Sequence, residues 1–291
     1  MNAQRPLAAV LAALMLTASA ALAASATGEG VNVGNASAMR NLVPAETLEK
    51  QAQQQYAQLK RDAAQKNALA PDQHPQVLRL RRIARELIPF SAKFNPRARQ
   101  WQWEVILLSS PQINAFCMPG GKIAFYTGIL DKLQLTDDEV AMVMGHEIAH
   151  ALREHARERV GKQAITHIGK SLLGIASDIA GFGSLGRVVI DGSGNLLTLK
   201  FSRDDESESD LIGMELAARA GYDPRAGVTL WQKMSAANKG APPQWLSTHP
   251  SGPSRIKDIE SHLPEVLPIY QKVRATAARP SREKPSASTP R

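Results

Sequence analysis

Hydrophobic residues recur at helical spacing in the first third of the chain. The stretch from Pro44 to Lys66 is rich in Gln, Ala and Lys, a composition typical of a helix. A second helix is expected from Pro75 to Ile88, where apolar residues three, four or more positions apart form one face. The residues of that face are Val77, Leu78, Ile83, Leu87 and Ile88.

The pattern changes between residues 101 and 128, where short runs of β-branched and aromatic residues replace the helical spacing. Pro111 and the Pro119–Gly121 run separate these segments, as turn residues do between strands. We therefore expect a small sheet of about three strands. The segments are Trp101–Ser110, Ile113–Met118 and Lys122–Gly128.

A capping box then opens another helix, because Thr136 is followed three positions later by Glu139. This helix is expected to continue to about Val160. Together the patterns predict an α+β fold that is predominantly α, with a small β-sheet beside this helix. The later helices are expected as two within Gln163–Leu197, interrupted at Gly181–Gly186, and then at Asp204–Ala220, Pro224–Asn238 and Ser254–Leu263.

Both ends of the chain depart from this pattern. Arg5, the apolar stretch Leu7–Ala20 and the small residues up to Ala23 are typical of a cleaved signal peptide. The apolar stretch is too short for a transmembrane anchor, and no cysteine follows Ala23 to carry a lipid. The expected organisation is a signal peptide at 1–23, a flexible lead at 24–41, one folded domain at 42–268 and a disordered basic tail at 269–291.

Composition supports an exported globular protein. The 291 residues are 43% hydrophobic and 21% charged, an ordinary globular balance. The net charge of +8 falls to +7 without Arg5. Residues 271–291 hold much of this charge and contain no aromatic residue, so nucleic-acid binding has no support. Cys117 is the only cysteine, so no internal disulfide is expected, and we interpret it as a small buried hydrophobe. A bacterial periplasmic location is expected, without an integral membrane span; peripheral membrane association is left open.

The sequence HEIAH places His146, Glu147 and His150 within one helical turn. Residues four apart share a helix face, so both imidazoles can reach one metal ion with Glu147 beside them. The alternative is a surface histidine pair; such a motif arises by chance in about one chain in a hundred of this composition. On a continuous helix His155 would lie about 180° from His146 and could not join the same ion.

A catalytic zinc ion needs three protein ligands and one further position for water. The acidic segment Ser202–Gly213 offers Glu206 and Asp210, which share a face at i, i+4, whereas Glu208 should face elsewhere. In the economical arrangement Glu206 binds the metal and Asp210 accepts a hydrogen bond from a ligand histidine. A solvated acidic helix start is an equal alternative on spacing alone.

Four segments, NAFCMPGGKIAFYTGIL, HEIAH, FSRDDESESDLIG and STHPSGPSRI, resemble in their order the motifs of a gluzincin peptidase family. That family, numbered forty-eight among the metallopeptidases, includes the CAAX prenyl proteases and HtpX-like proteins. The resemblance covers about Leu78 to Leu263 and implies a zincin-like domain with one zinc ion per chain. It places the third ligand on Glu206 and the family's aspartate on Asp210, while Ser209 stands where alanine is usual. Without extra apolar helices, the chain looks like the soluble, exported branch.

The implied activity is that of a zinc metalloendopeptidase with Glu147 as the general base. Extended or unfolded polypeptides would be the substrates, and a strand at 122–126 is expected to pair with them as a sheet edge. A plain structural edge is the alternative for that strand, which consists of Lys122, Ile123, Ala124, Phe125 and Tyr126.

His249 lies in the segment STHPSGPSR, which Pro250 keeps extended. We expect His249, together with Arg255, to stabilise the oxyanion or to occupy the fourth zinc position at rest. The alternative is a turn histidine without a chemical role. The family resemblance further suggests a role in periplasmic protein quality control; the competing function is a zinc-containing chaperone or assembly factor that rarely cuts its clients.

Overall fold

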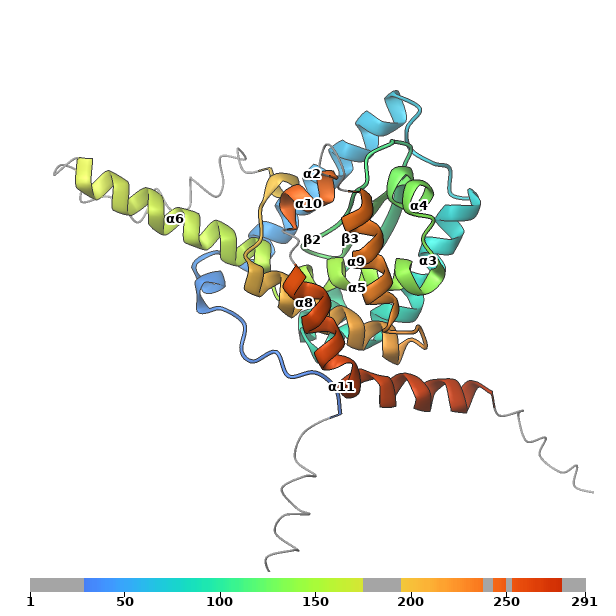
Figure 1. The fold of residues 1–291 in the computed structure, drawn as a ribbon. Coiled ribbons are helices and arrows are strands. Elements are labelled where there is room, and N and C mark those ends of the chain that lie inside the picture. The colour runs from blue at the N-terminus through green and yellow to red at the C-terminus, as the bar shows by residue number, and fades with distance from the viewer. Residues whose placement is uncertain (1–28, 175–194, 238–242, 250–252, 279–291) are drawn as a thin grey trace, which may run out of the picture. The chain divides into compact units, whose positions relative to one another are not determined.

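The computed structural model describes residues 29–174, 195–237, 243–249 and 253–278, and the elements named below lie from Val31 onward. Helices dominate and one small sheet lies among them, which confirms the expected α+β, predominantly α fold (Figure 1). In chain order the elements are η1 (Ala38–Leu42), α2 (Ala45–Gln65), α3 (Pro75–Leu87), η2 (Ile88–Lys93), η3 (Pro96–Gln100), β1 (Glu104–Leu108), β2 (Ala115–Met118), β3 (Lys122–Tyr126), α4 (Thr127–Leu133), α5 (Asp137–Leu152), α6 (His155–Gly174), η4 (Leu196–Thr198), α8 (Arg203–Arg219), α9 (Ala226–Ala237), α10 (Gln244–Thr248) and α11 (Pro253–Ala277).

The sheet has the strand order β1-β3-β2. β1 pairs with β3 in parallel, with Glu104 opposite Lys122, and β2 pairs with β3 antiparallel, with Ala115 opposite Phe125. β3 is therefore the central strand, and the expectation that it forms a sheet edge is wrong. The expectation fails because β1 pairs with the side of β3 that β2 leaves open. That correction concerns Lys122, Ile123, Ala124, Phe125 and Tyr126.

A glycine pair makes the tight return from β2 to β3. Gly120 and Gly121 have φ angles of +80° and +79°, a region that residues with a Cβ atom rarely adopt. A Cβ on Gly121 would also lie 2.7 Å from the ring of Trp103. The turn thus needs glycine at residue 121 for backbone and packing reasons together.

The sheet lies between two helical layers, and its side chains alternate between them. Residues such as Leu107, Ile123 and Phe125 belong to the large core shared with α3, α5, α8 and α9. Their neighbours Ile106 and Ala124 belong to a second core that the sheet shares with α2. The motif helix α5 therefore packs on one face of the sheet and α2 on the other.

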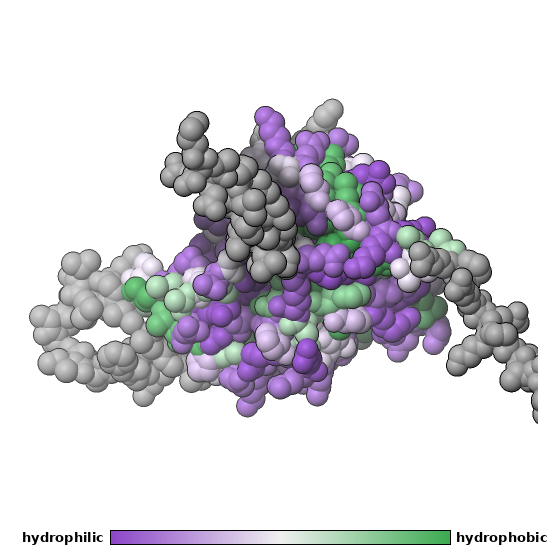
Figure 2. Space-filling model, turned by 90° about the horizontal axis from the view of Figure 1, so that it is seen from below, coloured by the Kyte–Doolittle hydropathy of each residue, from purple (hydrophilic) through white to green (hydrophobic). Residues whose placement is uncertain are grey.

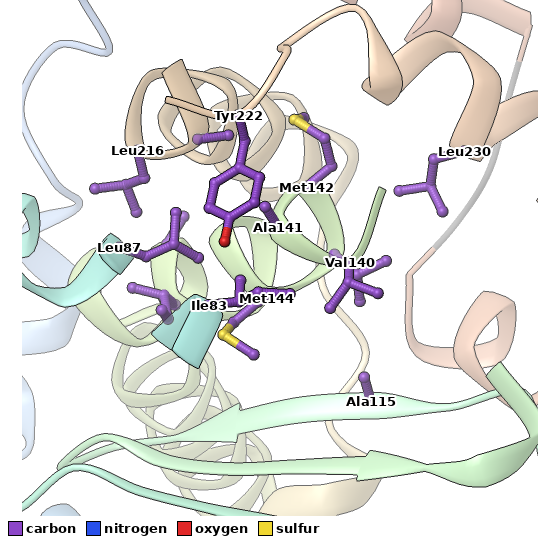
Figure 3. Close-up of a cluster of buried hydrophobic side chains, with 14 of the residues drawn as sticks. Ile83, Leu87, Ala115, Val140, Ala141, Met142, Met144, Leu216, Tyr222 and Leu230 are labelled. Atoms are coloured by element: carbon purple, nitrogen blue, oxygen red, sulfur yellow. The ribbon is translucent and has the colours of Figure 1, made fainter. Parts of the chain in front are cut away.

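Helix α5 is buried on all sides from Glu139 to Leu152. Its capping box forms as predicted, because the Thr136 hydroxyl accepts from the Glu139 N–H and the Glu139 carboxylate accepts from the Thr136 N–H. Figure 3 shows its side chains among those of neighbouring elements, with Met144 toward Ile83 and Val140 on the side of Leu230. This burial fixes the motif residues in a rigid environment.

Two helix boundaries differ from those predicted. α5 ends at Leu152 and α6 begins at His155, so one continuous helix to Val160 is wrong; Glu154 between them has φ +60°. α11 continues through Pro264 and Pro268 to Ala277, beyond the expected end at Leu263 and into the segment expected to be disordered from 269. Burial of Val266 and Ile269 in the core offsets the cost of those prolines.

Most of the other predicted helices are present, and some predictions concern residues that the structure does not describe. The helices expected at 44–66, 75–88, 204–220 and 224–238 are present within two residues of their predicted ends. Of the two helices expected within 163–197, α6 covers the first part to Gly174, and residues 175–194 lie outside the described residues. Residues 1–28, which include the expected signal peptide, and 279–291 lie outside them as well.

Large hydrophobic side chains are rarely exposed on the described part of the chain. The face in Figure 2 is mainly hydrophilic, with smaller hydrophobic areas between polar ones. The large exposed hydrophobic residues are Met39, Leu42, Leu78 and Ile165, so Leu78 does not contribute to the buried face of its helix. Among the described residues, no helix combines the length and hydropathy needed to span a membrane.

Candidate metal centre

The two motif histidines of α5 point their outer ring nitrogens at the same place. Nε2 of His146 and Nε2 of His150 are 3.0 Å apart, and both rings are buried. Two neutral imidazoles can approach so closely with lone pairs directed at one cation. The one-turn spacing in the sequence thus produces the expected shared face.

Glu206, in the first turn of α8, brings a carboxylate to the same place. Its Oε2 lies 3.6 Å from Nε2 of His146, and its Oε1 lies 3.4 Å from Nε2 of His150. A second capping box, Ser202 with Asp205, fixes the start of this helix. The structure therefore brings together the three residues that the sequence put forward as ligands.

The donor set and its spacing fit a zinc ion. Zinc sits about 2.0–2.2 Å from nitrogen and oxygen ligands in a tetrahedron, so neighbouring donors should lie about 3.3–3.6 Å apart. The two Nε2 atoms are 3.0 Å apart, and each lies 3.4 to 3.6 Å from one oxygen of the Glu206 carboxylate, Oε2 for His146 and Oε1 for His150, so these distances come close to that spacing. Two imidazoles and one carboxylate are a typical ligand set of catalytic zinc sites.

His249 adds a fourth donor to this cluster. It follows the short helix α10, and its Nδ1 lies 3.0 Å from Oε1 of Glu206 and 3.3 Å from Nε2 of His146. Within the described residues, His146, His150, Glu206 and His249 form a group whose donor atoms all lie within 4.8 Å of one another. In this conformation His249 occupies the region that a fourth zinc ligand would take.

Glu147 lies beside the four-residue group rather than in it. Its Oε1 accepts a hydrogen bond of 2.6 Å from the indole N–H of Trp245, and Nε2 of His249 is 3.7 Å away. Trp245 also stacks on His249, with ring centroids 4.9 Å apart. Trp245 is not among the residues that the sequence predicted for this site; its position four residues before His249, one helical turn away, is the signal that points to it.

A buried ion-pair network holds His146. Oδ1 of Asp210 lies 2.9 Å from Nδ1 of His146, as expected for a group that fixes the ring's tautomer. Arg255 donates to both Asp210 oxygens at 2.7 Å and to Oε2 of Glu206 at 2.5 Å. The guanidinium itself lies over the ring of Trp231, 3.8 Å from its centroid. Arg255 thus contacts both carboxylates and holds them in place relative to each other.

Burial and neighbouring charges set the protonation of this cluster. Burial lowers the pKa of His150 well below its ordinary value, which keeps the ring neutral as metal binding requires. Burial opposes ionisation of Glu206, but His249 and His150 outweigh it and hold the pKa of this carboxyl far below its usual range. For Asp210 burial is likewise outweighed, here by Arg255, so the pKa of Asp210 is lowered. Both carboxylates are therefore negative at neutral pH.

A small pocket of about 40 Å³ lies between strand β2 and this centre. Its lining includes Asn114–Pro119, Leu196, Leu199 and Phe201, together with Glu147, His150 and His249. Within the described sheet β2 pairs only with β3, so β2 is an edge strand beside this pocket. Cys117 lines the pocket, partly buried, and burial raises the pKa of its thiol, so it is a poor nucleophile.

The part of the chain that holds this centre is similar to known proteins. The family model described as peptidase family M48 matches residues 75–263. Mitochondrial metalloendopeptidase OMA1 of Arabidopsis thaliana is 39% identical over 177 residues, which cover 60% of this chain and 34% of the relative. The same-named protein of Schizosaccharomyces pombe is 34% identical over 199 residues, covering 68% of this chain and 56% of the relative.

The chain is also similar to a bacterial protein. The beta-barrel assembly-enhancing protease of Escherichia coli is 28% identical over 172 residues, covering 56% of this chain and 35% of the relative. The matched region thus spans about a third to just over half of the length of these curated relatives. The family match covers well over half of this chain and contains every residue of the four-donor group. The chain therefore belongs to peptidase family M48, a family of zinc metallopeptidases.

Proposed function

We propose that this chain is a zinc-dependent endopeptidase that cuts misfolded or unassembled polypeptides in the bacterial periplasm. The observation that carries the proposal is the convergence of His146, His150 and Glu206 on one point with Glu147 beside it. Bound there, zinc would supply a Lewis acid that makes water nucleophilic at neutral pH. Glu147 accepts the proton of the attacking water and delivers it to the leaving amine.

The remaining residues hold this arrangement. Asp210 keeps a hydrogen on Nδ1 of His146, so that Nε2 presents its lone pair to the centre. Arg255 bridges Asp210 and Glu206 and so fixes the third ligand relative to the first. We assign to His249 the resting position in the fourth ligand site, because its Nδ1 is 3.0 Å from Glu206 and 3.3 Å from His146. Substrate cleavage then requires α10 and His249 to move aside.

An extended substrate would add to the sheet at β2. The strand Ala115–Met118 lines the pocket that contains Glu147 and His249, and backbone pairing at its free edge would read side chains weakly. Such binding suits an enzyme that acts on unfolded chains of varied sequence. This assignment replaces the expectation for residues 122–126.

The periplasmic setting depends on the N-terminal pattern of residues 1–23. The likeness to a protein named for the assembly of β-barrels supports it, because bacterial β-barrels lie in the outer membrane. The more similar relatives are mitochondrial by name. Cell fractionation, with mass spectrometry of the mature N-terminus, tests the point; we expect the protein in the periplasmic fraction with Ala24 as its first residue.

The activity is tested with purified residues 24–291 and unfolded casein. We expect fragments that disappear when a chelator is added and return with one equivalent of zinc. The contact of Trp245 and His249 with Glu147 also favours the second candidate, a zinc-containing chaperone with little proteolysis. Stoichiometric zinc without any cleavage would support that candidate, and a protein without zinc would overturn both.

A further inference from the structure

The second ligand histidine, His150, is supported by a histidine outside the motif. Nδ1 of His155 lies 2.9 Å from Nδ1 of His150, and the rings meet nearly edge to face at 76° with centroids 5.0 Å apart. On its other side, Nε2 of His155 lies 2.7 Å from Oε2 of Glu208. His155 is buried, and the proposed mechanism uses neither it nor Glu208.

A break in the chain creates this contact. On a continuous helix His155 would lie about 140° around the axis from His150, too far for their rings to meet. Instead α5 ends at Leu152, and Glu154 adopts φ +60°, a conformation that is uncommon and costly for a residue with a Cβ atom. The unusual backbone at Glu154 turns the start of α6 so that His155 lies behind His150.

The hydrogen bonds that join these three residues are donated in one direction, from His150 to His155 and from His155 to Glu208. An ionised carboxylate only accepts, so Glu208 takes the hydrogen on Nε2 of His155. With its hydrogen on Nε2, His155 presents the lone pair of Nδ1 to Nδ1 of His150, 2.9 Å away, and accepts the hydrogen there. That arrangement leaves the lone pair on Nε2 of His150, the atom that faces His146 and Glu206.

We propose that His155 and Glu208 are positioning residues that fix the tautomer and orientation of His150 for metal binding. This inference rests on the proposed function, since it presumes that the four-residue group binds zinc. The support for His150 parallels that for His146, where Asp210 contacts the ring directly, but here a second imidazole lies between ring and carboxylate.

An arginine donates to the carboxylate behind each of the two histidines. Arg255 holds Asp210 on the His146 side, and Arg153 donates to Oε1 of Glu208 at 2.5 Å on the His150 side. Arg153 also donates to the carbonyl oxygens of Val33 and Gly34 at 3.4 and 3.2 Å. The segment before η1 is thereby tied to the groups that orient His150.

The test measures zinc affinity by competition with a chelating indicator. Glu208→Gln keeps the side chain's shape and His155→Phe keeps the ring; each should weaken zinc binding about 10–100-fold, the usual effect of losing such outer partners. His155→Asn retains an acceptor near the position of Nδ1 and should recover part of the affinity. The absorption spectrum of the cobalt-substituted protein should change in the Phe variant because His150 is free to rotate.

Matched controls are Glu260→Gln and His262→Phe on α11, away from the centre, which should bind zinc like the unaltered protein. Thermal unfolding of the metal-free variants separates a structural role from a positioning role. Wild-type zinc affinity in both Glu208→Gln and His155→Phe, with lowered metal-free stability alone, would overturn the inference and leave the proposed function intact. A failure of the unaltered protein to bind zinc would instead overturn the proposed function.

Discussion

Gly145 of α5 and Gly213 of α8 face each other so closely that a Cβ atom on either would stand 2.8 Å from the backbone of the other helix. This contact lies next to His146 and about two turns along α8 from Glu206. The close approach of the two helices is what lets a carboxylate on α8 reach two imidazoles on α5. Glycine at these positions is therefore part of the geometry of the metal centre.

We expect Gly213→Ala to destabilise the protein by about 1–3 kcal/mol, the usual cost of an added group in a tight core. Because the added methyl group would meet the backbone nitrogen of His146, α8 must shift and take Glu206 with it. Zinc affinity should fall with stability. Urea unfolding of the metal-free protein and a chelator competition measure the two effects.

Gly227→Ala is the matched control, since its methyl group would meet the flexible end of Met142 at 3.1 Å and the side chain of Ile259 at an ordinary contact distance of 3.5 Å, but no backbone. It should cost less stability and leave zinc affinity unchanged. Equal effects of the two substitutions would show that the contact of Gly213 with α5 does not position Glu206.

Local patterns predicted the parts of the site that depend on spacing along one helix. The positions of His146 and His150 follow from a one-turn separation, and the capping box at Thr136 marks the start of their helix in sequence and structure alike. Glu206 and Asp210 followed from i, i+4 spacing together with the family resemblance. These relations are visible in sequence because the helix itself fixes them.

Contacts between segments far apart in the sequence could not be predicted from local patterns. The central place of β3 depends on β1 pairing with its outer side, and nothing within residues 122–126 reveals that partner. The course of α11 past its prolines depends on burial of Val266 and Ile269. The contact of Trp245 with Glu147 joins segments 98 residues apart, and the break at Glu154 has no glycine to mark it.

Replacing the acceptor of the water proton should abolish cleavage without removing the metal. We expect Glu147→Gln to lower kcat about 10²–10⁴-fold, because an amide cannot take up the proton. Zinc content should stay at one per chain, since Glu147 is not among the four grouped donors. Casein digestion and elemental analysis measure the two properties. Retained proteolysis in this variant would contradict the role given to Glu147.

Removing the fourth donor should open the centre. We expect His249→Ala to raise the basal rate of cleavage several-fold, since its imidazole no longer holds the fourth ligand position. Zinc should bind somewhat more weakly because one nitrogen donor is lost. Initial rates on a fluorescent unfolded substrate measure the change, with His262→Ala on α11 as the control. A fall in rate with unchanged zinc affinity would instead indicate that His249 stabilises the oxyanion.

Glu139 should make the stability of the metal-free protein depend on pH. Burial opposes ionisation of this carboxyl, but Lys233 at 2.7 Å, the N–H of Thr136 at 2.8 Å and the hydroxyl of Thr229 at 2.8 Å outweigh it and lower its pKa. Because the folded pKa lies below the unfolded value of about 4.3, this stabilisation is present above that pH and is lost as pH falls through the folded pKa. Glu139→Gln does not titrate, so it should be less stable than the unaltered protein at pH 7, and this difference should shrink as the pH falls to about 3. Urea unfolding across this range, with chelator throughout and Glu260→Gln as the control, measures the difference; a gap that stays constant with pH would contradict the role given to Glu139.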